Sequence, residues 1–279
     1  MRNSVCSETT FTAKTGQIEM HTERKVTFVV AINNRDLLEA NFLRSPCVRG
    51  RHVHEILVQQ NFSSAAKAYN DAISKSRNDL IVFCHQDVIF PEAWLSRLEN
   101  ALDDLTVQDP AWGVLGCYGK TSDGDAWGQV YSSGLGVIGT PVKRPKAVQT
   151  LDELVLILRK SSGLRFDERL PHFHLYGTDI CLAAAKTGMK SYAMSAFCIH
   201  NTQLNLVLPK EFYECCKCVK RMWREYLPIQ TTCVRITRFN VPLYERRLRE
   251  SHLRYVRSKE IGAFRVKDTQ RLLERFDLF

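Results

Sequence analysis

The sequence predicts an α/β protein built around a mostly parallel sheet. Unbroken apolar runs occur at residues 26–32 and 80–83, and a shorter one at 55–58, with helix-like segments between them. Such runs are typical of strands that are buried on both faces, as in a parallel sheet. The strand–helix units are each under about 30 residues, which favours right-handed crossovers between neighbouring strands.

The helices of the first half are expected after these strands. One helix fits residues 37–43, and Ser63 and Ser64 offer a cap for the next, which carries apolar residues at helical spacing. Pro91 suits the first turn of a third helix. Its inner face would hold Trp94, Leu98, Ala101, Leu102 and Leu105.

The second half is less regular. Residues 113–117 are strand-like, residues 119–139 form a glycine-rich stretch expected to be an exposed excursion, and residues 154–158 are apolar. A helix is expected from Thr178 to Lys186, with Gly188 as its stop. A final strand over residues 191–199 would end at His200, and the chain from about Phe212 has a helical character.

Length and charge suggest three parts. A chain of 279 residues can form one large domain with an appendage. We predict a disordered segment over 1–24, an α/β domain over 25–211 and a basic helical extension over 212–279. Residues 217–279 hold 16 Lys/Arg against 7 Asp/Glu, whereas the remainder is neutral. This favours an acidic partner, such as an anionic membrane, or else a solvated basic tail.

The cysteines and the apolar runs indicate a cytoplasmic protein. No apolar run approaches the roughly 18 residues that cross a bilayer, and the first residues lack the apolar core of a secretory signal. Several of the ten cysteines lie in strand-like runs, as buried free thiols do. Cysteines 215, 216 and 218 do not match a usual zinc spacing.

Polar residues at the end of the strand 80–83 are the first candidates for chemistry. His85 and Asp87 would project to the same side of an extended chain, at the edge where open α/β sheets bind ligands. Imidazole and carboxylate together suit a divalent metal or a phosphate. Alternatively, Asp87 only caps the helix that starts near Pro91.

The order of these pieces resembles the GT-A fold, family-2-like glycosyltransferases that use nucleotide sugars, from about Lys25 to Thr202. Residues 31–34 (Ala-Ile-Asn-Asn) correspond to the family's loop for the nucleotide base, and residues 61–70 to a helix ending in Asn70. Residues 81–87 fill the slot of the Asp-x-Asp motif. Residues 165–168 and 176–182 resemble the acceptor-side segment, and His200 matches a histidine that closes the metal site.

This resemblance implies an inverting transfer of sugar from a nucleoside-diphosphate sugar, expected to be a UDP-sugar, to a glycan, lipid-linked or protein acceptor. A cation, Mn²⁺ or Mg²⁺, would be held by Asp87, His85 and His200. Asp179 would be the general base, with His174 as the second candidate. The implied donor-binding residues are Ala31, Asn33, Asn34, Gln60, Lys67, Asn70 and Gln86.

Two departures from the family pattern leave alternatives open. The Asp-x-Asp slot reads His-Gln-Asp, and the usual base position is Gly177. A catalytically idle protein that binds a nucleotide sugar or another partner is therefore the second hypothesis. Asp179 can equally be a helix-start carboxylate, and ordinary structural roles are open to His172, His174, His200 and Lys67. Nucleic-acid binding is not favoured, because the basic tail lacks interleaved aromatic residues.

Overall fold

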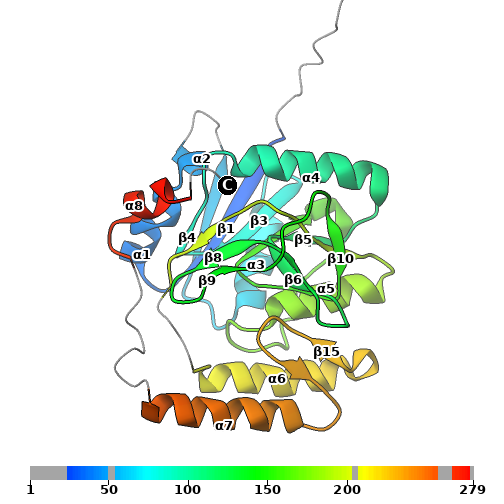
Figure 1. Ribbon diagram of the computed structural model, residues 1–279. Coiled ribbons are helices and arrows are strands. Elements are labelled where there is room, and N and C mark those ends of the chain that lie inside the picture. Colours follow the sequence, from blue (N-terminus) through cyan, green and yellow to red (C-terminus); the bar gives the residue numbers. More distant parts are fainter. Residues whose placement is uncertain (1–23, 50–53, 203–206, 257–265, 277–279) are drawn as a thin grey trace, which may run out of the picture.

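A seven-stranded mixed sheet forms the centre of the protein (Figure 1). The computed structural model describes residues 24–49, 54–202, 207–256 and 266–276. The strand order is β10-β13-β5-β12-β3-β1-β2. Five strands run in the same direction: β1 (Val26–Ile32), β2 (Glu55–Gln60), β3 (Leu80–His85), β5 (Val114–Gly116) and β13 (Ser191–Ala193). The predicted mostly parallel α/β sheet is confirmed.

Helices cover both faces of this sheet (Figure 1). On one face α3 (Ala65–Lys75), α5 (Tyr176–Lys186) and α6 (Lys210–Met222) contribute to one core cluster. On the other, α1 (Arg35–Ala40), α2 (Pro46–Arg49) and α4 (Trp94–Gln108) contribute to a second. Short 3₁₀ turns lie at Phe42–Arg44 and Lys160–Ser162.

The predicted helices of the first half are confirmed in their packing. All five residues expected on the inner face of α4 are buried: Trp94, Leu98, Ala101, Leu102 and Leu105. Ser64 caps α3 by accepting a hydrogen bond from the Lys67 N–H at 3.4 Å. The third helix begins at Trp94, three residues after Pro91.

One central strand runs against its neighbours. β12 (Val155–Arg159) lies between β3 and β5 and is antiparallel to both, with Val155 opposite Cys84. The residues just before Val155 therefore lie at the carboxyl end of β3. The edge strand β10 (Lys146–Val148) is also antiparallel to its neighbour β13.

The glycine-rich stretch 119–139 is mostly paired strand, so its prediction as an exposed excursion was wrong. It contains β6 (Tyr118–Lys120), β7 (Ala126–Gly128), β8 (Val130–Ser132) and β9 (Gly136–Ile138). Gly128 has φ +82°, and a Cβ there would lie 2.1 Å from the Cys117 carbonyl oxygen. The glycine allows two backbone segments to approach closely. A high glycine content is also typical of flexible loops, so composition alone does not distinguish the two cases.

The predicted final strand is split into two. After β13 the chain leaves the central sheet, and β14 (Ile199–His200) pairs with β8 and with β4 (Val88–Ile89) in a separate four-stranded sheet. The pairing of β14 with β4 places His200 opposite Val88. A three-stranded sheet joins β11 (Thr150–Leu151), β6 and β7.

The predicted boundary at residues 211/212 falls inside α6, whose buried residues join the main core. A 3₁₀ turn (Arg224–Tyr226), β15 (Ile229–Gln230), β16 (Arg235–Ile236) and α7 (Val241–Val256) follow. α8 (Thr269–Glu274) packs back against β4 and β14 through Leu272 and Leu273. Disorder was predicted for residues 1–24. Residues 1–23 lie outside the described residues, whereas Arg24 is placed and pairs with Asp103. Among the described helices none is long and apolar enough to cross a membrane.

Candidate functional site

Three side chains with metal-ligating atoms meet where β3, β4 and β14 come together. Ligand atoms of His85, Asp87 and His200 all lie within 4.8 Å of one another. His85 ends β3, Asp87 precedes β4 by one residue, and β14 brings His200 to them by pairing with β4. Within the described chain this is the one group of three or more His, Cys, Asp or Glu residues that could hold a metal ion.

The residues predicted for the metal are thus close together, and their surroundings suit metal ligands. Asp87 is 8% exposed, and its Oδ1 lies 3.3 Å from Nε2 of His200. Burial, and next the nearby His200, lower the pKa of His85 to about 4, so its imidazole is neutral near pH 7. Neutral imidazole and carboxylate are the forms that bind cations.

A hydrogen-bond chain orients His85. The Tyr176 hydroxyl donates to the Glu153 carbonyl oxygen at 3.0 Å, so it accepts from Nε2 of His85 at 2.8 Å. This assigns the proton of His85 to Nε2 and leaves the lone pair on Nδ1 for a ligand. Two imidazoles and one carboxylate suit a divalent cation that accepts nitrogen ligands better than Mg²⁺, which prefers oxygen ligands.

Gln86 holds the loop that follows β1. Its Oε1 accepts hydrogen bonds from the Asn33 and Asn34 N–H groups, both at 3.1 Å, and its amide donates to the Asn33 Oδ1 at 2.6 Å. Asn34 in turn caps α1 by accepting from the Leu37 N–H at 3.2 Å. Gln86 therefore fixes the position of the loop at residues 33–34, which lies next to the His85, Asp87 and His200 cluster.

A cavity of about 250 Å³ lies beside the same loop. Ala31 is in register with Gln59 on β2 and with His85 on β3, so the cavity adjoins the cluster. Its lining includes three predicted donor-binding residues, Ala31, Asn33 and Gln60, together with Ile32, Gln59, Asn61, Phe62, Ala68 and Phe173. The aromatic side chains and the amides offer stacking and hydrogen bonding to a planar heterocycle.

Four predicted donor-binding residues lie outside this lining. Asn34 and Gln86 belong to the hydrogen-bonded loop described above, whereas Lys67 and Asn70 lie on α3. Lys67 is exposed on α3. Asn70 donates to the Phe166 carbonyl at 2.9 Å and to Glu168 at 3.0 Å, and accepts from the Phe166 N–H at 3.0 Å. Asn70 therefore fixes the segment 165–168 against α3, and no contact of Lys67 or Asn70 connects it with the cluster.

Asp179, the predicted base, is 0% exposed and its two oxygens have partners. Oδ1 accepts from the Trp223 indole N–H at 2.8 Å, and Oδ2 accepts from the Asp167 N–H at 3.0 Å. Burial raises its pKa to about 6. A carboxylate enclosed in this way joins α5 to α6 and to the segment before α5. We therefore correct its assignment to a structural role, because an acceptor hydroxyl has no access to it.

His174, the second candidate base, is half-buried near the cluster and packs edge-on against Phe212. Burial lowers its pKa, and its charged form disfavours protonation of His85. The neighbouring His172 pairs instead with Glu214 on α6, at 2.9 Å. The loop before α5 is therefore held by α6 and lies close to the candidate site.

The sequence reading missed Glu153. A Cβ added to Gly177 would lie 3.2 Å from Cγ of Glu153 and 2.8 Å from the Leu151 carbonyl oxygen. The carboxylate therefore occupies the space beside the position where the family carries its base. Burial, and next the nearby Asp152, raise the pKa of Glu153 well above its ordinary range, while the backbone N–H groups of residues 175–177 act to lower it. The sequence did contain a signal, the acidic pair Asp152-Glu153 directly before the apolar run 154–158. To place this pair at the site, however, one must know that β12 runs antiparallel to β3.

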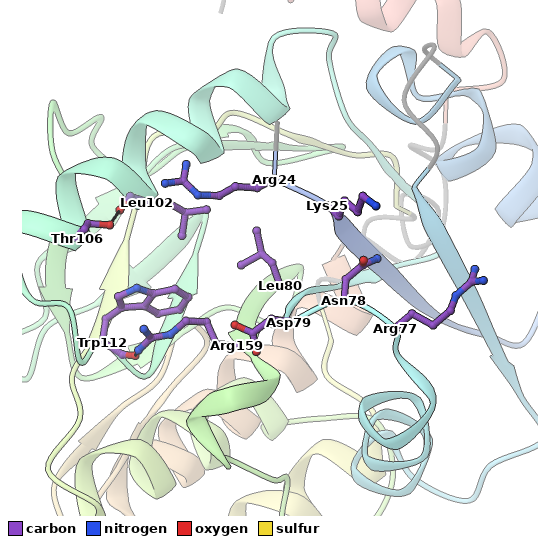
Figure 2. A pocket seen from close by; sticks show the side chains of 10 residues that line it. All are labelled: Arg24, Lys25, Arg77, Asn78, Asp79, Leu80, Leu102, Thr106, Trp112 and Arg159. Atoms are coloured by element: carbon purple, nitrogen blue, oxygen red, sulfur yellow. Dashed lines mark hydrogen bonds between the residues drawn. The ribbon is translucent and has the colours of Figure 1, made fainter. Parts of the chain in front are cut away.

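A second cavity, of about 430 Å³, lies at the opposite ends of β1 and β3 (Figure 2). Three of its arginines contact other groups of the fold. Arg24 pairs with Asp103 at 2.6 Å, and Arg77 pairs with Glu55 at 2.7 Å. Arg159 donates to two backbone carbonyls and stacks over the Trp112 ring. This cavity is remote from the cluster, because it lies at the opposite strand ends. Arg24 and Arg77 are paired with carboxylates, whereas Nε of Arg159 is buried without a hydrogen-bond partner.

The chain is similar to known proteins both in sequence and in structure. A protein of Fuscovulum blasticum described as "ATP synthase subunits region ORF 6" is 27% identical over 143 residues, which cover 48% of this chain and 55% of that protein. Staphylococcus aureus TarS (residues 1–349) has a TM-score of 0.42 at 13% identity, with 71% of this chain and 64% of TarS covered. A mannosyltransferase from Pyrobaculum calidifontis, solved with GDP-Man and Mn²⁺, has a TM-score of 0.41 at 13% identity, with 64% of this chain and 57% of that one covered.

The chain therefore spans about half the length of the curated relative that it matches, and the structural likenesses are low. A family model described as a glycosyltransferase-like family matches residues 27–222, which is most of the chain. The protein belongs to this glycosyltransferase-like family, and this confirms the family-2-like GT-A resemblance of its sequence.

Proposed function

We propose that the protein transfers a sugar from a nucleoside-diphosphate sugar to an acceptor hydroxyl. The observation that carries the proposal is the position of the His85, Asp87 and His200 cluster directly beside a cavity suited to a nucleotide base. These features share the carboxyl ends of β1 and β3, where open α/β sheets bind ligands. A UDP-sugar as the specific donor stays a prediction.

The cluster would receive the diphosphate of the donor. Nδ1 of His85, a carboxylate oxygen of Asp87 and an imidazole nitrogen of His200 would hold a divalent cation, with Mn²⁺ favoured over Mg²⁺ by the two imidazoles. A bound cation supplies positive charge that stabilises the departing diphosphate. Gln86 holds the loop that would contact the nucleotide base next to this site, through its hydrogen bonds to the Asn33 and Asn34 N–H groups.

We assign Glu153 as the acceptor-side base in place of Asp179. Oxygen of the acceptor hydroxyl attacks the anomeric carbon and forms the new glycosidic bond, while the bond from that carbon to the phosphate oxygen breaks. The electron pair leaves with the diphosphate, and the hydroxyl proton passes to the Glu153 carboxylate. Attack from the face opposite the leaving group would invert the anomeric carbon.

A panel of UDP- and GDP-sugars, with and without Mn²⁺, tests the proposal by donor hydrolysis and transfer. We expect Glu153→Gln to lower turnover by about 10²–10⁴-fold while donor affinity by calorimetry stays within about threefold. Asp123→Asn, at an exposed carboxylate outside the candidate site, is the control and should retain activity. No turnover of any donor with Mn²⁺ present would sink the transferase proposal.

The second hypothesis is a nucleotide-sugar-binding protein without catalysis. The histidine at the first position of the Asp-x-Asp slot and the glycine at 177 favour it. It predicts that wild type binds a nucleoside diphosphate with Mn²⁺ and shows no turnover, and that Glu153→Gln and Asp123→Asn leave this binding equally unchanged.

A further inference from the structure

The inner face of α7 is fixed by contacts with α6 and the core. Leu243 packs against the main core cluster. Glu250 is 4% exposed, accepts hydrogen bonds from the Tyr213 hydroxyl at 2.7 Å and the Leu208 N–H at 3.2 Å, and pairs with Arg246 at 2.8 Å. These contacts determine which side of the helix faces away from the protein.

The opposite side of α7 carries an exposed apolar stripe. Val241, Tyr244 and Leu248 are 56%, 63% and 72% exposed, and their spacing of three and four residues aligns them along one face. Phe239, immediately before the helix, is 73% exposed. Figure 1 shows α7 at the periphery, with α6 between it and the sheet. Large apolar side chains gathered on one outer face mark an interaction surface.

Cations border this stripe. Arg238 and Arg249 are exposed, and Arg247 lies over the Tyr213 ring at 4.3 Å. These three positive charges outnumber the one exposed carboxylate on α7, that of Glu245. Apolar side chains with aromatic members, flanked by arginines, are the composition of helices that lie in the interface of an anionic bilayer. A second copy of this chain would instead bring the same arginines towards one another.

We propose that the stripe of Phe239, Val241, Tyr244 and Leu248, with its flanking arginines, docks onto an anionic lipid surface. The apolar side chains enter the boundary between headgroups and acyl chains, while the arginines meet lipid phosphates and carboxylates. This surface is separate from the candidate site, so the proposal does not depend on the proposed transfer reaction. It places the α6 side of the protein, with the loop held by the His172–Glu214 pair, towards the membrane.

Vesicle flotation of the full chain tests the proposal. Vesicles of phosphatidylcholine alone are compared with vesicles containing about one-third phosphatidylserine, at low and high salt. We expect binding to the anionic vesicles only, with a decrease at high salt. Tyr244→Ser/Leu248→Ser should weaken binding by about tenfold or more, and Arg249→Gln by roughly fivefold, the equivalent of about 1 kcal/mol per surface arginine.

Val107→Ser provides the matched control, because Val107 is 88% exposed on α4, away from α7. It should leave flotation unchanged. All the substituted side chains are exposed, so urea denaturation should show wild-type stability for each variant. The proposal is overturned if wild type does not float, or if the double variant floats as well as wild type. It is equally overturned if sedimentation shows a dimer that the double variant dissociates while no flotation occurs.

Discussion

Replacing Asp179 with asparagine should change the pH dependence of stability more than it changes turnover. In wild type both carboxylate oxygens accept hydrogen bonds, from the Trp223 indole and from the Asp167 N–H. Asparagine keeps one oxygen but presents an NH₂ group where the other stood. One buried donor therefore loses its acceptor, at a cost of about 1–3 kcal/mol.

The carboxyl group adds a pH-dependent contribution that asparagine lacks. Burial raises the pKa of Asp179 from 3.8 to about 6. The difference, about 2.2 units at ~1.36 kcal/mol each, amounts to about 3 kcal/mol. Because the folded-state pKa is raised, this stabilisation is fully present below about pH 3.8 and is lost as the pH rises through about 6. Asp179→Asn should therefore be clearly less stable than wild type near pH 4 and approach or exceed it near pH 8.

Urea denaturation of both proteins across this pH range measures the difference, and other titrating groups cancel in the comparison. Asp123→Asn, at an exposed carboxylate, should show no such trend. Turnover per folded molecule should stay within about tenfold of wild type. A pH-independent stability difference, combined with a loss of turnover above about 100-fold, would refute the structural role and restore Asp179 as the base.

Three further substitutions test the fold and the cluster. Asn34→Ala removes the cap of α1 and should lower the free energy of unfolding by about 1 kcal/mol in urea. Gly128→Ala places a Cβ 2.1 Å from the Cys117 carbonyl and should cost roughly 3 kcal/mol or prevent folding, whereas Gly124→Ala, with open space around it, should cost only about 1–2 kcal/mol of backbone strain. Tyr176→Phe frees Nε2 of His85 and should weaken Mn²⁺ binding by about 10–100-fold in a spin-resonance titration.

Periodicity predicted the elements that depend on a single buried face. The apolar positions of α4 and the run 26–32 appear in the structure as read, because an amphipathic helix or a two-sided buried strand leaves its pattern in the sequence. His85 and Asp87 share one strand end, which their spacing indicated, whereas His200 was joined to them only by the resemblance to the family. Local sequence was sufficient for α4, for the run 26–32 and for the pair His85 and Asp87, but not for His200.

Strand direction left no such pattern. Residues 155–159 are buried and apolar whichever way the strand runs, so the antiparallel insertion of β12 between β3 and β5 was not visible. That direction alone carries Glu153 to the end of β3. Asp179 was predicted to be the base, although its position in the first turn of α5 does not identify its role. An acidic residue at this position occurs both in catalytic sites and in buried structural contacts.

The Glu153 side chain fills the space beside Gly177, the position at which the family carries its base. This permits a direct test of where a carboxylate is needed for transfer. Glu153→Gly should abolish transfer, and adding Gly177→Asp to it should restore part of the lost turnover, since the new side chain would start 3.2 Å from the vacated Cγ position. Restoration should be incomplete, because the new Cβ lies 2.8 Å from the Leu151 carbonyl oxygen, and that backbone must shift at a cost of about 1–3 kcal/mol. Gly177→Asp alone should lower both stability and turnover, since Glu153 still fills the space.

The comparison of single and double variants separates catalysis from packing. If only packing mattered, Glu153→Gly would relieve the crowding of Gly177→Asp and rescue stability without rescuing transfer. Rescue of both supports a carboxylate requirement at this point in space that either segment can meet. Full transfer by the Glu153→Gly variant alone would show that neither position supplies the base.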